Sequence, residues 1–328
     1  MNPLEGRPVH IAGGGILGLA TAHALAKAGA RVTLFDASED RPSASAIAAG
    51  MLAPAFEACL DPVSRPHYRL LRDARNLWPE FAGETGIVLD RGGARYRGAG
   101  IDAVLAELQA IGADWESRED DVFTAEDWRV DPGQALPALR RTLDRAGVRT
   151  VGKRLETPDP DVATVAATGW ELLEWAPETL ALTAIKGHIL TLPGQSSGEA
   201  VERSRSGYLC PSSQGLRLGA TMEPGRSDLI PDPTVAGALF DRLAPPALWP
   251  VRASSTIQVG IRAATADGLP MVGPSARPGI WLAVGARRNG WLLAPLVARM
   301  MAAYLAGGDS GFWSQALWPG RFEVSTGE

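Results

Sequence analysis

Three glycines and one aspartate near the start of the chain have the types and spacing of a nucleotide-binding site. The glycines Gly13, Gly15 and Gly18 form a G-x-G-x-x-G pattern, and Asp36 follows at the distance expected of this fingerprint. The first glycine permits a tight turn, the second lets the backbone approach a pyrophosphate, and the third lets a helix pack closely on a strand. Free N–H groups and the helix dipole attract phosphates, while the carboxylate can accept hydrogen bonds from ribose hydroxyls.

The elements that must position these residues are two buried strands with a helix between them. Residues 9–12 form an apolar run that ends at the glycines, as a buried parallel strand does. Apolar residues then recur at helical spacing until Gly29, and residues 32–35 form a second strand. This order predicts a Rossmann-type dinucleotide site, and the alternative is a glycine-rich turn without a ligand. A carboxylate at the ribose suits FAD or NAD and disfavours NADP.

Other segments of the sequence must distinguish FAD from NAD. Residues 43–54 are small and weakly helical, which lets backbone come close to a flat ring system. Residues 162–170 form a third strand-like run, and residues 280–284 form a fourth, followed by an apolar helix over 290–304. A second helix start would then lie beside the first at the carboxyl ends of the strands, where its positive end can stabilise a reduced flavin.

Together, these segments resemble the D-amino acid oxidase family of FAD-dependent oxidoreductases, and most closely its glycine oxidase branch, which serves thiamine biosynthesis. The matching stretches are IAGGGILGLATAHALAKAGARVTLFD, AAGMLAP, YLCPSSQGLRLGATMEPG, VGIRAATADGLPMVGP and GARRNGWLLAP, and they run in this order from one end of the chain to the other. The resemblance implies an α/β fold, with a Rossmann-type FAD-binding domain and a substrate domain of mixed, mostly antiparallel sheet plus helices. Both domains are expected to be discontinuous: 1–80, 131–172 and 262–328 for FAD, and 81–130 and 173–261 for the substrate.

The resemblance also implies noncovalent FAD and a set of residues that hold it. They are the glycines of the first turn, the small residues of the second segment, and the starts of the later strand and helix connections. These residues are Gly13, Gly15, Ile16, Leu17, Gly18, Asp36, Ala37, Ala49, Gly50, Met51, Thr168, Gly169, Arg262, Arg288, Asn289, Gly290, Trp291 and Leu292.

A substrate site for a small amino acid needs a cation, because the substrate carries a carboxylate and the planar fork of arginine meets both of its oxygens. The resemblance assigns this role to Arg262, with Tyr208 as a second donor and Arg288 near the pyrimidine end of the flavin. Met51 and Met222 match positions that line the pocket. These are the expected catalytic and pocket residues.

The implied reaction is oxidative deamination of glycine, sarcosine or a small D-amino acid. Hydride passes from Cα to flavin N5, and dioxygen reoxidises the flavin to give hydrogen peroxide. Orientation and electrostatics do most of this work, so no base is required, and His188, alone on a strand-like run, is read as structural. In the thiamine branch, the imine of glycine feeds thiazole formation. A dehydrogenase with another electron acceptor and a non-catalytic flavin protein stay open.

Two departures from the family pattern affect these expectations. Family members often carry histidine and an aromatic residue where this chain has Ala286 and Arg287. The extra arginine is expected either to alter the pocket mouth or to admit an acidic substrate, such as iminodiacetate or another N-carboxymethyl amine. The segment 148–169 is short, which predicts a trimmed flavin domain there.

The bulk composition excludes several classes of protein. The chain has 328 residues, of which 45% are hydrophobic and 21% charged, as in a globular protein of two joined domains. A net charge of −5 gives no electrostatic case for nucleic acid. Cys59 and Cys210 are too few for a disulfide framework or a zinc site, so no metal is expected. Without an apolar run of membrane-spanning length or a signal peptide, we expect a cytoplasmic protein whose partners are an amino acid and dioxygen. Homo-oligomers are common among its relatives.

Overall fold

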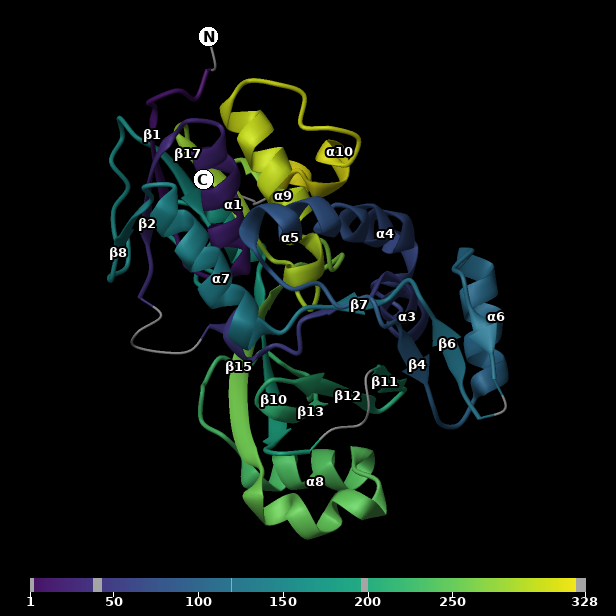
Figure 1. Ribbon diagram of the computed structural model, residues 1–328. Coiled ribbons are helices and arrows are strands. Elements are labelled where there is room, and N and C mark those ends of the chain that lie inside the picture. Colours follow the sequence, from purple (N-terminus) through teal and green to yellow (C-terminus); the bar gives the residue numbers. More distant parts are fainter. Residues whose placement is uncertain (1–2, 38–42, 119, 196–199, 323–328) are drawn as a thin grey trace.

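Two sheets of different kinds organise the chain (Figure 1). The computed structural model describes residues 3–37, 43–118, 120–195 and 200–322. No helix within these residues is long and apolar enough to cross a lipid bilayer.

The first sheet has six strands in the order β16-β17-β9-β1-β2-β8. Its neighbouring pairs are parallel except β16 with β17. Because β9 lies on one side of β1 and β2 on the other, the chain leaves the carboxyl end of β1 at the switch point where α/β folds bind ligands. All four strands predicted from the sequence are confirmed. The strands are β1 (Pro8–Ala12), β2 (Arg31–Phe35), β8 (Arg149–Val151), β9 (Ala163–Ala166), β16 (Met271–Pro274) and β17 (Ile280–Val284).

Helices with apolar faces pack around this sheet. The two predicted helices, α1 (Ile16–Lys27) and α9 (Gly290–Leu305), lie side by side and share one hydrophobic core with the strands. Trp78 in the same core donates from Nε1 to the carbonyl of Leu292 at 3.2 Å, which ties the start of α5 to the first turn of α9. The other helices of this layer are α4 (Tyr68–Asn76), α5 (Trp78–Thr85) and α7 (Pro132–Arg145).

The second sheet has nine strands in the order β14-β10-β13-β12-β11-β4-β6-β5, with β15 paired along β10. All pairs are antiparallel except β11 with β4, so the expected mixed, mostly antiparallel sheet is confirmed. The strands are β4 (Ala94–Tyr96), β5 (Glu116–Ser117), β6 (Val122–Thr124), β10 (Thr183–Leu192), β11 (Val201–Ser204), β12 (Gly207–Ser212), β13 (Gly215–Gly219), β14 (Glu223–Pro224) and β15 (Thr256–Ala264).

The two faces of this sheet differ in what covers them. Successive side chains of a strand point to opposite faces. Leu190 and Leu218 therefore pack with Leu239 and Phe240 of α8 (Pro233–Leu243) on one face. On the opposite face the strands carry glycines, which leave room above the sheet. That face is turned toward the first sheet.

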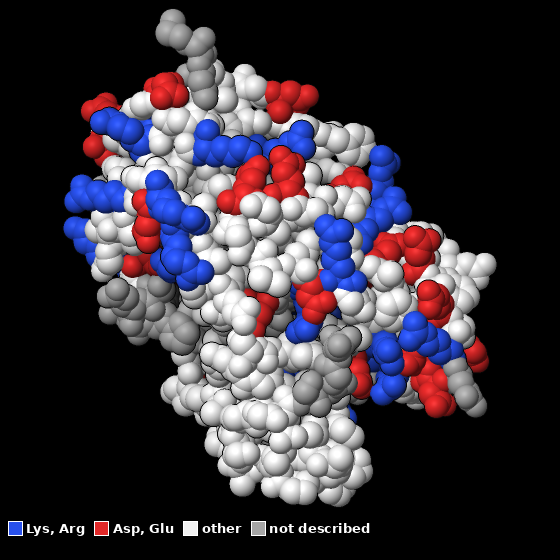
Figure 2. All heavy atoms as spheres, viewed as in Figure 1, with Lys and Arg blue, Asp and Glu red and all other residues white. Residues whose placement is uncertain are grey.

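The remaining elements connect or cover the two sheets. A two-stranded sheet joins β3 (Met51–Leu52) to β7 (Trp128–Arg129). Figure 2 shows the face of the molecule that is turned to the viewer in Figure 1. Basic and acidic side chains are interspersed around the first sheet, and mostly uncharged atoms cover the end near α8. The other helices are α2 (Ala44–Ile47), α3 (Pro54–Leu60), α6 (Ile101–Ile111), α10 (Ser314–Leu317), and the 3-10 helices η1 (Arg65–His67), η2 (Pro177–Ala181), η3 (Pro246–Ser254) and η4 (Pro319–Arg321).

The positions of the strands in the two sheets can be compared with the expected domain ranges. All strands of the first sheet lie within the ranges expected for the FAD domain. The strands of the second sheet lie within the ranges expected for the substrate domain, except that β15 continues past residue 262. The boundary residues themselves stay a prediction.

Candidate functional site

Two adjoining cavities extend from the carboxyl end of β1 to the open face of the second sheet. The first has a volume of about 440 Å³ and the second about 280 Å³. The residues that line both are Ile16, Ala44, Ser45, Arg262, Arg287 and Gly290. A ligand that filled the first cavity would therefore border the second.

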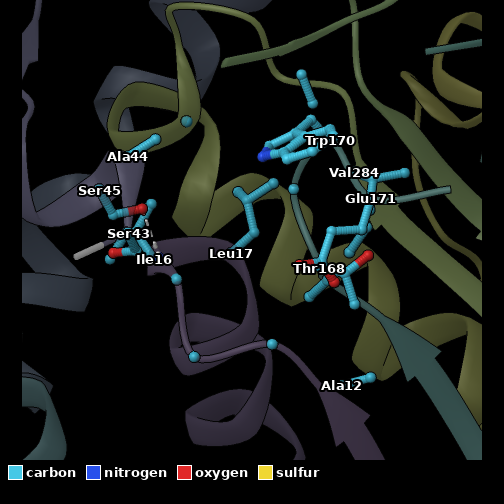
Figure 3. A pocket seen from close by; sticks show the side chains of 18 of the residues that line it. Ala12, Ile16, Leu17, Ser43, Ala44, Ser45, Thr168, Trp170, Glu171 and Val284 are labelled. Carbon is cyan, nitrogen blue, oxygen red and sulfur yellow. Dashed lines mark hydrogen bonds between the residues drawn. The ribbon is translucent and has the colours of Figure 1, made fainter. Parts of the chain in front are cut away.

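The turn between β1 and α1 lines the first cavity and depends on glycine in two different ways (Figure 3). Gly13 has a φ of 114°, and a Cβ on it would lie 2.3 Å from the carbonyl oxygen of Ala167. A Cβ on Gly18 would lie 1.9 Å from the carbonyl oxygen of Gly13, so this glycine allows α1 to pack on the turn. At Gly15 the nearest atom to such a Cβ is Ser45 Oγ, at 3.3 Å. Gly15 therefore keeps the backbone open toward the cavity.

The start of α1 fits a phosphate group. Its N-cap, Gly15, has no side chain that could cap it, and its first turn carries no acidic residue. The hydroxyl of Ser45 accepts from the backbone N–H of Ile16 at 3.0 Å, but this group carries no charge. The positive end of the helix is therefore not neutralised by a local charge, which is the condition that favours an anion.

Asp36 lies at the carboxyl end of β2 and faces the same cavity. Its Oδ2 is 2.6 Å from Arg140 Nη2, on α7, and the same guanidinium nitrogen is 3.4 Å from the carbonyl oxygen of Gly14. A Cβ on Gly14 would lie 2.0 Å from Asp36 Oδ2. Neither Gly14 nor Arg140 was identified from the sequence. The run Gly13-Gly14-Gly15 could have indicated the first, whereas Arg140 lies 104 positions from Asp36 and no local pattern connects them.

The opposite wall follows β9. Thr168 and Gly169 line the cavity as predicted, and the Thr168 hydroxyl is buried with no hydrogen-bond partner in the described parts of the chain. A buried hydroxyl of this kind fits a polar ligand atom. Trp170 and Glu171 also line the wall, and Figure 3 shows the Trp170 ring on the side that faces Leu17. An aromatic ring suits stacking against a flat heterocycle.

Arg262 is on β15 and borders both cavities. Its Nη1 donates to the carbonyl of Thr221 at 3.2 Å, and it makes no ion pair with any described residue. The guanidinium lies directly over Gly187 of β10, where a Cβ would be 2.1 Å from Nη1. Burial lowers the pKa of Arg262. An unpaired guanidinium at this depth favours an anionic ligand.

Tyr208 is on β12 and has its phenol over Gly219, where a Cβ would be 2.2 Å from Oη. Burial raises the pKa of Tyr208 to about 12, so the phenol is neutral and can donate a hydrogen bond. Met51 and Met222 line the same cavity. The structure therefore brings together Arg262, Tyr208 and both methionines, as expected.

Arg288 borders the second cavity, but a carboxylate already holds it. Its Nε is 2.9 Å from Glu57 Oε1, and its Nη2 donates to Oε2 at 3.1 Å. Arg203 approaches Glu57 Oε2 at 3.4 Å from the other side. Glu57 and Arg203 were missed from the sequence because Glu57 lies 231 positions from Arg288 and 146 from Arg203.

Arg287 corrects one expectation from the sequence. It forms an ion pair with the buried Asp61, which was not foreseen. Although burial opposes it, hydrogen bonds from Arg287 and Ser64 hold the pKa of Asp61 below its usual range. Arg287 is therefore neutralised within the protein, and it is not a spare cation for an acidic substrate.

His188 is fully buried, and neighbouring groups contact both of its ring nitrogens. Nδ1 is 2.9 Å from Glu223 Oε1, and Nε2 accepts from the backbone N–H of Asp232 at 3.0 Å. His188 lines neither cavity. This arrangement fits the structural role that the sequence suggested. Among the described residues, no group of three or more His, Cys, Asp and Glu could hold a metal ion.

The expected cofactor residues divide between the cavities. Ten line the first: Gly13, Gly15, Ile16, Leu17, Asp36, Ala37, Thr168, Gly169, Arg262 and Gly290. Six more line the second: Ala49, Gly50, Met51, Arg288, Asn289 and Trp291. Gly18 and Leu292 lie outside both cavities, the first at the packing contact described above and the second in the core.

Comparison with known proteins gives a family and a fold. A family model described as FAD dependent oxidoreductase matches residues 9–304. The tRNA 5-methylaminomethyl-2-thiouridine biosynthesis bifunctional protein MnmC of Maricaulis maris is 28% identical over 96% of this chain, which spans about half of that protein (55%). The glycine oxidase of Pseudomonas aeruginosa is 25% identical, over 91% of this chain and 94% of its own length. The crystal structure of glycine oxidase from Geobacillus kaustophilus superposes with a TM-score of 0.78 at 22% identity, covering 97% of this chain and 100% of the other.

Proposed function

Since the chain belongs to the FAD dependent oxidoreductase family, we propose that it oxidises a small amino acid that it binds by the carboxylate. The observation that carries this proposal is Arg262, an unpaired guanidinium in the described structure that borders the cavity of the nucleotide turn and the cavity beyond it. A charge-assisted pair with a carboxylate would neutralise it. The neutral phenol of Tyr208 is the second donor.

The first cavity is the place that we propose for FAD, bound without a covalent link. The backbone of the Gly13–Gly15 turn and the start of α1 suit the pyrophosphate, and the unpartnered hydroxyl of Thr168 suits a polar atom of the cofactor. Gly290 begins α9 where the two cavities meet, so its helix end would face the flavin ring. When bound, FAD would take a hydride from the substrate Cα and deliver the electrons to dioxygen, with hydrogen peroxide as the product.

The protein's own contribution is to orient the substrate and keep its surroundings apolar. Arg262 and Tyr208 would fix the carboxylate, and Met51 and Met222 would cover the Cα side of the pocket. His188 contributes no base, because it is buried outside both cavities. The amine must be neutral when it reacts, because its lone pair helps to expel the hydride from Cα, and the imine product hydrolyses in water.

We propose glycine, sarcosine and small D-amino acids as substrates, with a role in thiazole formation for thiamine if glycine is preferred. The similarity to two glycine oxidases supports this choice. A dehydrogenase with a carrier other than oxygen is the alternative, and hydrogen peroxide formed in air would exclude it.

The test is anaerobic reduction of the flavin, followed by its visible absorbance. The panel is glycine, sarcosine, D-alanine, D-proline, iminodiacetate and glyphosate. We expect at least one of the small amino acids to bleach the flavin, and admission of air to restore its colour with release of hydrogen peroxide. A flavin that stays oxidised with every compound would overturn the proposed function.

A further inference from the structure

Thr221 connects the wall of the second cavity with the opposite face of the second sheet. It lies in the connection between β13 and β14, beside His188 of β10. Its two neighbours in the chain, Ala220 and Met222, line the second cavity, whereas Thr221 lines neither cavity. Because successive side chains of an extended segment point to opposite sides, the side chain of Thr221 lies behind the cavity wall.

Polar contacts on that side fix the Thr221 hydroxyl. Its Oγ1 accepts from the backbone N–H of His188 at 2.8 Å and donates to Glu223 Oε1 at 3.1 Å. The ring nitrogen Nδ1 of His188 lies 3.2 Å from this hydroxyl and 2.9 Å from the same carboxylate oxygen. The ring itself is fully buried, and its Nε2 accepts from the backbone N–H of Asp232. The hydroxyl is therefore held by groups that are themselves held in place.

The carbonyl of Thr221 points the other way, toward Arg262. It accepts from Arg262 Nη1 at 3.2 Å, and within the described parts of the chain it is the only hydrogen-bond acceptor of this guanidinium. The guanidinium reaches it from β15 by crossing β10 over Gly187, since β15 pairs with one edge of β10 and β13 and β14 pair with the other. Thr221 thus joins polar groups on one face of the sheet to the cation on the other.

We propose that Thr221 is a positioning residue for Arg262. The inference rests on the proposed function, in which Arg262 binds the substrate carboxylate. The fixed hydroxyl keeps the backbone of Thr221 in place, and its carbonyl then orients the guanidinium before the substrate arrives. An arginine that is oriented in advance loses less conformational entropy when it binds its ligand. Thr221 acts on the substrate through Arg262.

The experiment replaces Thr221 in the holoenzyme with valine, which keeps the shape of the side chain but not the hydroxyl, and with serine, which keeps the hydroxyl. The substrate is the amino acid that reduces the bound flavin fastest. We expect Thr221→Val to raise KM about five-fold or more, as the loss of a hydrogen-bonded support allows. The change should lie in KM rather than in kcat, because Arg262 binds the carboxylate and not the reacting atoms. Thr221→Ser should stay within about two-fold of the wild type.

Thr191→Val is the matched control. Thr191 is a buried threonine on β10, the strand that carries His188, and it lines neither cavity. Loss of a buried hydroxyl should lower the unfolding temperature of both valine variants, but only Thr221→Val should raise KM. Flavin absorbance and circular dichroism check that each variant is loaded and folded.

A double-mutant cycle with Arg262→Ala identifies the residue through which Thr221 acts. Met222 follows Thr221 and lines the same cavity, so a shift of this segment would also move Met222. If Thr221 acts through Arg262, Thr221→Val should leave kcat/KM of the Arg262→Ala enzyme unchanged. A loss in that background as large as in the wild type, or an unchanged KM in Thr221→Val alone, would show that the inference is wrong while the proposed function stands. If no amino acid reduces the bound flavin, both are wrong.

Discussion

Arg262 is the side chain on which the proposed binding of the substrate carboxylate depends most. Its guanidinium is held in place by the Thr221 carbonyl and by the space over Gly187, and no described carboxylate neutralises it. Replacing Arg262 with alanine should raise KM for the substrate roughly 10-fold or more, since a hydrogen-bonded charge pair contributes about 1.5–3 kcal/mol. FAD should stay bound. Steady-state kinetics and the flavin spectrum of the same sample measure both.

Gly187→Ala tests whether Arg262 binds the substrate, without removing the arginine itself. The new Cβ would lie 2.1 Å from Arg262 Nη1, so the guanidinium must shift, and KM should rise in this variant as well. Gly83→Ala on α5 is the matched control, because no atom lies within 4 Å of the Cβ that it adds. Unchanged kinetics in both Arg262→Ala and Gly187→Ala would remove Arg262 from the site.

A substitution at Gly15 is expected to affect cofactor binding without affecting folding. A Cβ at Gly15 meets only Ser45 Oγ at 3.3 Å, whereas one at Gly18 would lie 1.9 Å from the Gly13 carbonyl oxygen. Gly15→Val should therefore fold but lose FAD, because its side chain fills the space above the turn. Gly18→Ala should instead lower the unfolding temperature. A purified Gly15→Val protein that remains yellow would contradict the assignment of the phosphate turn.

Among the helices and strands, the sequence predicted those whose residue pattern lies within a single short segment. The strands ending at Ala12 and Val284 are almost entirely apolar, with His10 as the exception, because both faces of a parallel sheet are largely buried. Of the strands of the second sheet, the sequence pattern indicated the run around His188, which is β10, and the sheet as a whole was expected through the family resemblance. Their periodicity is interrupted by glycines such as Gly187 and Gly219, which make room for Arg262 and Tyr208 rather than for sheet packing.

The missed site residues share one physical cause. Glu57, Arg203 and Arg140 meet their partners across separations of 100 residues or more, and each lies on an element whose own pattern is that of ordinary packing. Charge complementarity across the fold leaves no periodic trace in the sequence. It appears only when α3, β11 and α7 have been placed around the cavities.

The helix α3 carries Glu57, which holds Arg288, and ends directly before Asp61, which holds Arg287. Asp127 holds the start of that helix. Asp127 accepts from the backbone N–H groups of Ala55 and Phe56, at 2.8 and 3.0 Å. Burial raises the pKa of Asp127 to about 7. A group with a raised pKa in the folded state stabilises the fold at low pH, and this contribution is lost as pH rises from about 4 to about 7.

Asp127→Asn should remove this pH dependence. The stability deficit of the variant, measured by urea unfolding, should be largest near pH 4 and shrink toward pH 7, because the wild-type protein alone loses the contribution. Tryptophan fluorescence follows the transition, and Asp241→Asn, at an exposed position on α8, is the control. A deficit that is constant between pH 4 and pH 7 would show that Asp127 is ionised throughout.

For the whole molecule, the important feature is that the two cavities meet where the two sheets face each other. Residues from the starts of α1 and α9, from α2 and from β15 line the shared part, so segments from both ends of the chain border it. Trp291 adds a direct link by donating from Nε1 to the carbonyl of Ser45 at 3.1 Å. A cofactor in this place would contact both parts of the fold at once.

FAD should therefore stabilise the whole protein and not the nucleotide turn alone. Ligand that binds only the folded state adds about 2.7 kcal/mol at a concentration 100 times Kd, so the apoprotein should unfold several degrees lower and recover when FAD is added. Gly15→Val should show no recovery, because it cannot accept the cofactor. Circular dichroism reports the helices, and tryptophan fluorescence reports the ten tryptophans of the chain, of which Trp78 and Trp291 lie in the core of the first sheet. If FAD contacts both sheets, the unfolding temperatures measured by circular dichroism and by fluorescence should rise together when FAD is added. An unfolding temperature that does not change with added FAD would contradict the placement of the cofactor between the sheets.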